Sequence, residues 1–400
     1  MRFRVGGALL ALAVSCSTIV GAAGDSSDGP QVERGAEVIG DVVVPYVFDG
    51  DLRDLPLAPV WQPGDPIKEI PRRARPIIED PFAPPYERGF DRDPLLAIQE
   101  AAPRPLETDG GVSEILNFNG QGFTGVNPPD TVGDVGLNHY IQAINSPGGT
   151  DFTVHNKTTG AVIAGPIRLD NFGSGNCSSG FGDPIVLYDR DADRWMISEF
   201  SGGGNKLCVY VSQTPDPIAG GWCNYDFQAV NFPDYPKYGV WPDAYYLSTN
   251  ENLPASYAFD RENMIQCNPA RPLQRFTAPP LSGFGFQATL PADVDGATLP
   301  PPGSPGIFIR HNDTERHGPG GFPTTDLLQL FEFSVDWDVP ANSTFTGPFN
   351  IEIAEFSSDL CGFFTFSCFD QPGGGSDLDP LREINMWPRR GWRPARPRAR

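Results

Sequence analysis

The chain has 400 residues, of which 39% are hydrophobic and 11% aromatic, so it carries enough apolar side chains for a large core. Its 45 glycines and 43 prolines predict a fold rich in turns and loops. The formal net charge of −21 argues against a nucleic-acid or anionic-membrane partner, because phosphate binding needs a surplus of Lys and Arg. An acidic surface suits an exported protein and favours calcium or cationic partners.

Residues 1–24 have the pattern of a secretory signal peptide: two early arginines, an apolar run and then small residues. This run is too short to span a bilayer, and we expect cleavage after Ala23. Ala13–Cys16 also resembles a bacterial lipoprotein box, although Ala13 stands where Leu is usual. The predicted location is therefore secreted or cell-surface, with a lipid anchor on Cys16 as the alternative to cleavage.

Residues 25–110 are rich in proline and contain no cysteine. Proline at this density prevents regular strand ladders and favours extended segments. We interpret the segment either as a strap that lies over the folded body or as a stalk that leads away from a cell surface.

Four strand-like runs follow one another between Gly182 and Val230, and they are rich in Val, Ile, Tyr, Phe and Trp. Clusters of Gly, Pro, Asn and Asp separate them, which is typical of strands joined by hairpins. Four such strands form one up-and-down sheet, the unit from which a β-propeller is built. The runs are 184–189, 194–200, 207–213 and 222–230.

Similar units are predicted before and after this sheet, and an acid stands at or near the start of the first strand in each. These acids are Asp130, Asp183, Asp234 and Asp293, separated by 53, 51 and 59 residues. The predicted fold class is therefore all-β and β-propeller-like, with four-stranded antiparallel blades over residues 111–387 and a Pro-rich irregular N-terminal segment. A fifth unit would open at 381–387, which leaves open whether the ring closes.

Four stretches resemble a family of large secreted bacterial β-propeller proteins: 130–145 (DTVGDVGLNHYIQAIN), 183–200 (DPIVLYDRDADRWMISEF), 232–250 (FPDYPKYGVWPDAYYLSTN) and 333–348 (FSVDWDVPANSTFTGP). The resemblance covers roughly residues 112–387 and implies a secreted propeller, but it transfers no catalytic residue. Members of that family carry further strand units after the position of Trp387. Here an arginine-rich tail, 388–400, follows instead, which we interpret as out-of-frame translation of a chain that once continued.

Six cysteines remain after the predicted signal peptide, and an even number in an exported chain indicates disulfides rather than metal binding or catalysis. Fifteen pairings are possible for six cysteines. We predict Cys177 with Cys208 within one blade region, Cys223 with Cys267 across two blades, and Cys361 with Cys368 as a small hairpin clip.

The inner strands of a propeller converge on a central channel, where ligands usually bind. Asp130, Asp183, Asp234 and Asp293 could form an acidic ring there, in which two carboxyl groups act as acid and base in glycoside cleavage. The alternative is that each Asp caps a turn or accepts backbone N–H bonds at a strand entrance.

Tyr235, Tyr238 and Trp241 are the predicted aromatic faces for stacking on sugars. Asp293 and Asp295 place alternate carboxylates in a turn, so calcium is a possible cofactor there, and the alternative is no cofactor. The similar acids of 189–193 are better explained as a hairpin turn, because neighbouring arginines neutralise part of their charge.

No phosphate-binding glycine loop and no Gly-x-Ser-x-Gly motif occurs in the sequence. The leading hypothesis is therefore a secreted protein that binds or cleaves an extracellular glycan at the channel mouth; if an enzyme, it would be a glycoside hydrolase or a related carbohydrate-active enzyme. The alternatives are a non-enzymatic cell-surface or adhesion module and an inactive remnant.

Overall fold

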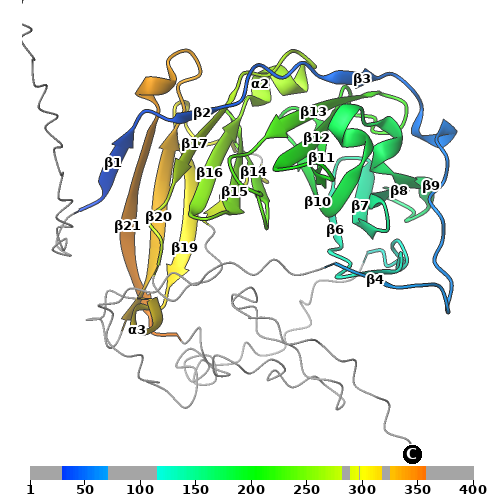
Figure 1. The fold of residues 1–400 in the computed structure, drawn as a ribbon, viewed down its shortest axis with the longest axis horizontal. Helices are drawn as coiled ribbons and strands as arrows, with labels where there is room; N and C mark the ends of the chain where they lie inside the picture. The colour runs from blue at the N-terminus through cyan, green and yellow to red at the C-terminus, as the bar shows by residue number, and fades with distance from the viewer. Residues whose placement is uncertain (1–28, 71–114, 282–288, 297, 318–324, 357–400) are drawn as a thin grey trace, which may run out of the picture.

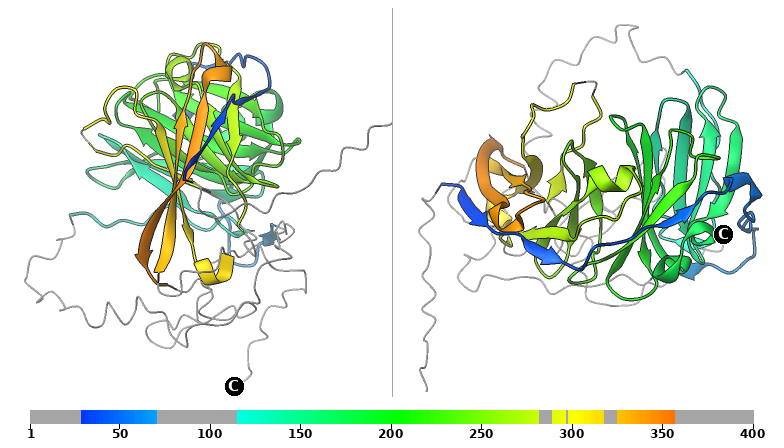
Figure 2. Two further views of the ribbon diagram at one scale, coloured as in Figure 1. Left: turned by 90° about the vertical axis from the view of Figure 1, so that its left-hand side faces the viewer. Right: turned by 90° about the horizontal axis from the view of Figure 1, so that it is seen from above.

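The computed structural model describes residues 29–70, 115–281, 289–296, 298–317 and 325–356, and these form an almost entirely β structure. Four antiparallel sheets stand side by side in an arc, with the first and the last at opposite ends (Figures 1 and 2). The predicted all-β, propeller-like fold is thus confirmed. The predicted signal peptide with Cys16, the fifth unit at 381–387 and the tail 388–400 lie outside the described residues.

Each sheet is one blade, and its four strands pair in chain order, as expected for an up-and-down sheet. Blade one contains β6 (Val132–Val135), β7 (His139–Ser146), β8 (Gly149–Asn156) and β9 (Val162–Arg168). Blade two contains β10 (Gly180–Asp189), β11 (Arg194–Ser201), β12 (Lys206–Ser212) and β13 (Trp222–Gln228). Blade three contains β14 (Lys237–Val240), β15 (Tyr245–Asn250), β16 (Pro254–Phe259) and β17 (Leu273–Thr277). Blade four contains β18 (Leu290–Pro291), β19 (Gly306–Asn312), β20 (Thr325–Ser334) and β21 (Thr344–Ala354).

The N-terminal segment crosses the outer edges of the blades in reverse order (Figure 1). Its strands β1 (Gln31–Arg34), β2 (Glu37–Ile39) and β3 (Tyr46–Phe48) pair antiparallel with β21, β17 and β13, the last strands of blades four, three and two. A single bridge from Leu57 to Ile167 then reaches β9 of blade one. The strap, residues 31–58, therefore covers the outermost strand of every blade, and such edges otherwise invite intermolecular pairing.

In the part of the chain that the structure describes, helix is confined to short pieces between the strands. These are α2 (Arg261–Ile265), α3 (Thr314–His317) and 3-10 turns at Leu52–Asp54, Leu169–Phe172, Gly175–Ser178 and Pro340–Asn342. After the strap, β4 (Lys68–Glu69) pairs in parallel with β5 (Val126–Asn127), which leads into blade one. Among the described helices none is long and apolar enough to cross a membrane.

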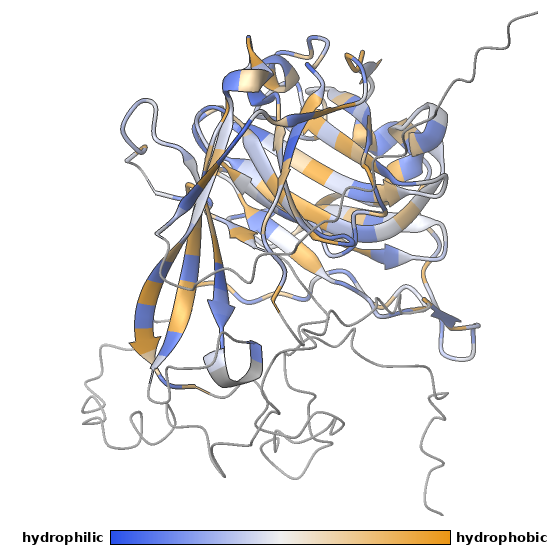
Figure 3. Ribbon diagram, turned by 60° about the vertical axis from the view of Figure 1, so that its left-hand side comes forward, coloured by the Kyte–Doolittle hydropathy of each residue, from blue (hydrophilic) through white to orange (hydrophobic). Residues whose placement is uncertain are grey.

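The core consists of three apolar clusters, each between two neighbouring blades. Apolar residues recur along the strands (Figure 3). Alternate residues point to opposite faces, so one strand of blade two, β12, contributes Val209 to one cluster and Tyr210 to another. Between blades one and two the cluster centres on Phe152, Trp195 and Trp222, which are at most 1% exposed. Tyr257 packs in the second cluster and Phe333 in the third. Aromatic burial of this size is the main source of stability in such a fold.

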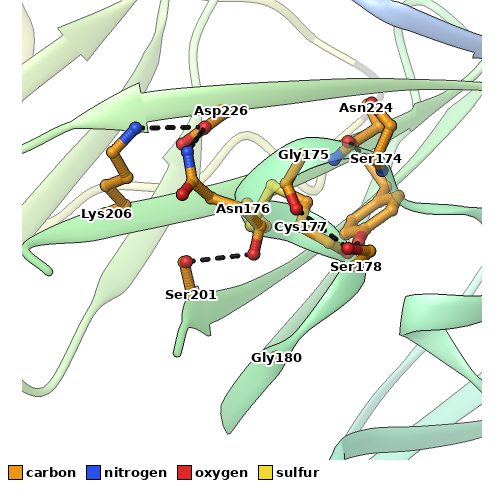
Figure 4. Close-up of a disulfide and its surroundings, with 12 residues drawn as sticks. Ser174, Gly175, Asn176, Cys177, Ser178, Gly180, Ser201, Lys206, Asn224 and Asp226 are labelled. Atoms are coloured by element: carbon orange, nitrogen blue, oxygen red, sulfur yellow. Dashed lines mark hydrogen bonds and ion pairs between the residues drawn. A yellow bond between two sulfur atoms is a disulfide. The ribbon is translucent and has the colours of Figure 1, made fainter. Parts of the chain in front are cut away.

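Two disulfides fix the blades, and both match the predicted pairs. Cys177 lies in the loop between blades one and two and is bonded to Cys208 of β12 (Figure 4). The second, between Cys223 and Cys267, joins β13 of blade two to the chain after α2 in blade three. Both are compatible with an oxidising, extracellular compartment. The third predicted pair, 361 with 368, lies outside the described residues.

Hydrogen bonds also attach the loop that contains Cys177 to blade two. The neighbouring Asn176 donates to the carboxylate of Asp226 and accepts from the hydroxyl of Ser201, 3.0 Å away (Figure 4). Lys206 also binds Asp226, at 3.1 Å. The loop that leads into β10, and therefore to Asp183, is held by covalent and polar bonds together.

Candidate functional site

Three of the four predicted acids lie at the same end of the inner strands. Asp130 stands two residues before β6, Asp183 lies near the start of β10, and Asp234 stands three residues before β14. All three side chains are half-buried. The negative charges of Asp130 and Asp234 both raise the pKa of Asp183, so the three carboxyl groups act on one another across blades one, two and three.

Asn145, near the end of β7, joins two of these acids. Its Oδ1 accepts the backbone N–H of Asp183 at 2.7 Å, and its Nδ2 donates to Oδ2 of Asp130 at 2.7 Å. Nδ2 also lies 3.0 Å from the carbonyl oxygen of Pro128 and 3.5 Å from Oδ1 of Asp183. The two carboxyl groups are thereby held beside one buried amide.

The backbone is strained at the same place in all three blades. Asp130, Asp183 and Tyr235 have φ of 40°, 53° and 53°, in the left-handed region that few residues other than glycine adopt. The N–H of Asn145 binds the carbonyl of Pro129, and that of Asn250 binds the carbonyl of Asp234, both at 2.8 Å. Tyr235 therefore occupies in blade three the position that Asp130 occupies in blade one. Such conformations cost about 1–3 kcal/mol each and concentrate at functional sites.

Lys237, at the start of β14, brings a positive charge to the three acids. Its Nζ lies 3.7 Å from the centre of the Tyr235 ring. Burial lowers the pKa of Lys237, and Asp183, Asp130 and Asp234 raise it again. The site thus combines three carboxyl groups with one ammonium, and the formal negative charge is only partly compensated.

Asp183 has the most perturbed titration of the three. Burial raises its pKa, and the Asp130 carboxyl raises it further, to about 7, although the hydrogen bond from Asn145 acts in the opposite direction. Two neighbouring carboxyl groups cannot both ionise easily, so at neutral pH Asp183 retains its proton for part of the time. A group in this state can donate a proton while a neighbouring carboxylate accepts one.

Asp293 does not join this group. It follows β18, and its carboxylate accepts the backbone N–H of Val240 at 2.7 Å, at the end of β14 that is remote from Asp234. Burial raises the pKa of Asp293 to about 6, with smaller contributions from Asp295 and Asp134. Within the described ranges no three His, Cys, Asp or Glu side chains come together in a way that could hold a metal ion, and the predicted calcium ligands Asp293 and Asp295 are included in that statement.

Of the three predicted aromatic residues, only Tyr235 lies beside the acids. It is 42% exposed, and Phe181, two residues before Asp183, is 39% exposed. Tyr238 is buried in the core cluster between blades two and three, where burial raises its pKa. Trp241 follows the other end of β14, and its Nε1 donates to the carbonyl of Ser304 at 3.1 Å. Tyr238 and Trp241 therefore present no face to a ligand at the acidic site.

Asn145 and Lys237 are the site residues that the sequence interpretation missed. Asn145 lies on the second strand of blade one, whereas the predicted acids were those at or near the first strand of each unit. Lys237 stands within DYPK, three residues after Asp234, so the local sequence did place a charge beside the predicted acid.

A buried acid, Glu199, lies between blades one and two but outside this network. Glu199 of β11 is 1% exposed. Two glycines make room for it, because a Cβ atom at Gly180 would lie 2.2 Å from its Oε2 and a Cβ atom at Gly149 would lie 2.8 Å from the same oxygen. Burial raises the pKa of Glu199 well above its usual range, and Asp170 adds to the effect. The low exposure and the raised pKa both disfavour the charged form of this carboxyl group.

Comparison with known proteins identifies no family for this chain: no family model matches, and no curated protein matches. Among solved structures, a chain described as a GH43 glycoside hydrolase, engineered at its active site to show endo-xylanase and exo-arabinofuranosidase activity, is 12% identical. The alignment covers 66% of this chain and 57% of that one, with a TM-score of 0.28. The four antiparallel sheets described above make the chain an all-β, propeller-like protein.

Proposed function

We propose that this is a carbohydrate-directed propeller-type protein that binds or cleaves an extracellular glycan at the mouth formed by blades one to three. The observation that carries the proposal is that Asp130 and Asp183 share the amide of Asn145, and that burial and the charges of Asp130 and Asp234 raise the pKa of Asp183 to about 7. Hydroxyl groups of sugars are good partners for carboxylates, and exposed aromatic rings such as Tyr235 and Phe181 offer faces for stacking.

In a cleavage reaction the roles would follow from the environments of the acids. Asp183, with its raised pKa, would donate the proton to the leaving oxygen, and Asp234 would act as the ionised carboxylate. Lys237 would keep Asp234 charged through their mutual attraction. Protein groups alone supply this chemistry, so the proposal requires no metal.

A non-enzymatic interaction module is the second candidate, and one observation favours it. The hydrogen bonds of Asn145 tie Asp130 and Asp183 to the backbone of two blades, which is also what a structural role at a strand entrance would require. In that case the site would bind a ligand without turning it over.

The two candidates are separated by isosteric variants tested against a panel of neutral oligosaccharides for both binding and hydrolysis. Asp183→Asn should abolish turnover while binding persists, and Asp234→Asn should reduce both. Asp293→Asn is the matched control, because the pKa of this acid is also raised, to about 6, but the acid lies at the other end of the strands.

Binding without turnover in the unmodified protein supports the interaction module. Turnover that survives Asp183→Asn rules out the assigned proton donor. If no oligosaccharide binds to the unmodified protein, or if Asp293→Asn has the same effect as the other two variants, the proposed glycan site is wrong.

A further inference from the structure

Asn145 is 0% exposed, and its carboxamide is used at both ends. Oδ1 accepts the Asp183 N–H at 2.7 Å, while Nδ2 donates to Oδ2 of Asp130 at 2.7 Å and to the carbonyl of Pro128 at 3.0 Å. Because the N–H of Asp183 requires an acceptor, the oxygen of the amide is fixed toward it and the NH₂ group is fixed toward the carboxyl groups.

This one side chain connects three segments that are distant in the sequence. They are the loop before β6, the end of β7 and the start of β10. The backbone of β10 approaches the amide so closely that a Cβ atom at Gly182 would lie 2.3 Å from Oδ1 of Asn145. Gly182 also has φ of +89°, so glycine is required there both for space and for backbone conformation.

We propose that Asn145 is the positioning residue of the site and holds Asp130 and Asp183 side by side as one carboxyl pair. The inference rests on the proposed function, since it assigns to Asn145 the task of placing the groups that meet the ligand. The amide has the acceptor and the donor that this task needs: an ionised Asp would accept the N–H but could not donate to a carboxylate, and Leu could do neither.

The amide also governs how the pair titrates. Its hydrogen bond favours the ionised form of Asp183, against burial and the charge of Asp130, which favour the protonated form. From blade three, Asp234, Tyr235 and Lys237 face the same groups, and their charges remain when Asn145 is replaced. Loss of the amide should therefore shift the titration in one direction only, upward.

The experiment is a carboxyl ¹³C NMR titration of aspartate-labelled protein from pH 4 to pH 10, with the two signals assigned from Asp130→Asn and Asp183→Asn. In Asn145→Ala the higher pKa of the pair should rise by about one to two units, the equivalent of a lost hydrogen bond to a charged group. Ser146→Ala is the control: this neighbour on β7 is equally buried and its hydroxyl binds Asp151, 3.0 Å away, rather than the pair.

If the higher pKa of the pair rises in Asn145→Ala and does not rise in Ser146→Ala, the positioning role is supported. Equal or no shift in both variants overturns it and leaves Asn145 a structural residue. If Asn145→Ala does not fold, Asn145→Asp keeps the shape of the side chain without its donor, and an unchanged pair in that variant also overturns the role.

The titration needs no ligand, so its result is separate from that of the glycan assays. If the pKa of the pair shifts in Asn145→Ala but no oligosaccharide binds, the proposed function is wrong and the positioning role of Asn145 stands. If the pKa does not shift but an oligosaccharide binds, the positioning role is wrong and the proposed function stands.

Discussion

Replacing Asp183 by Asn should stabilise the protein, by an amount that grows from about pH 4 and is complete above about pH 8. The pKa of Asp183 rises from 3.8 to about 7 on folding. Between these values the folded protein holds a proton that the unfolded chain releases, so stability falls as the pH rises through this window and the loss is complete above about pH 8. About three pKa units at 1.36 kcal/mol each give an upper limit of about 4 kcal/mol.

Asn is a suitable replacement because it resembles the protonated carboxyl group and tolerates the left-handed φ of 53°. Urea unfolding at pH 4, 6 and 8 should show almost no difference between Asp183→Asn and the unmodified protein at pH 4, and the full gain at pH 8. Asp293→Asn provides the comparison. The pKa of Asp293 is raised only to about 6, so the gain in stability from this variant should be smaller and should be complete by about pH 7. A gain for Asp183→Asn that is the same at pH 4 and pH 8 would refute the reasoning.

Three further changes test other parts of the structure by the same unfolding assay. Glu199→Gln should raise the free energy of unfolding more at pH 8 than at pH 4, because it removes a carboxyl group whose pKa burial raises; a loss of stability at pH 8 would contradict this. Replacing Cys177 and Cys208 together by Ser should cost about 3–4 kcal/mol, the loop-closure value for a sequence separation of 31 residues, and reductant should then have a smaller effect. Arg261→Ala should cost about 3–5 kcal/mol, because Asp189, which is 0% exposed, loses a bidentate partner at 2.6 and 2.9 Å; a cost below 1 kcal/mol would show that water replaces the arginine.

The strand order of the blades could be predicted from the sequence because it is local. Alternating apolar residues and turn clusters specify a hairpin within about twenty residues, as in β10 and β11, where Asp189 caps the turn by accepting the N–H of Ala192 at 3.0 Å. Blade four was predicted less well: Asp293 was assigned to a first strand, whereas β18 ends at Pro291. The spacing of acids is misleading in blade four, because Asp293 is a turn residue whose carboxylate accepts the N–H of Val240 in the adjacent blade.

The site was predictable only in part, because its parts come from different blades. The spacing of the acids along the sequence predicts that Asp130, Asp183 and Asp234 lie at the same end of the blades. It also predicts that the three are equivalent in position, whereas the residue of blade three with the equivalent backbone position is Tyr235. The role of Asn145 depends on its contact with β10, 38 residues away along the chain. No local pattern reports such a contact.

The strap relates the N-terminal segment to the rest of the molecule. β1 pairs with β21 more than 300 residues away in sequence, so its register can form only after blade four exists. Its successive pairings with blades four, three, two and one each cover the last strand of a blade. Ion pairs add to these backbone pairings: Glu37 binds Arg275 of β17 at 2.7 Å, and that arginine also binds the buried Glu251, at 3.2 Å. The strap therefore links the four described blades along their outer edges, far from the acids at the inner strands.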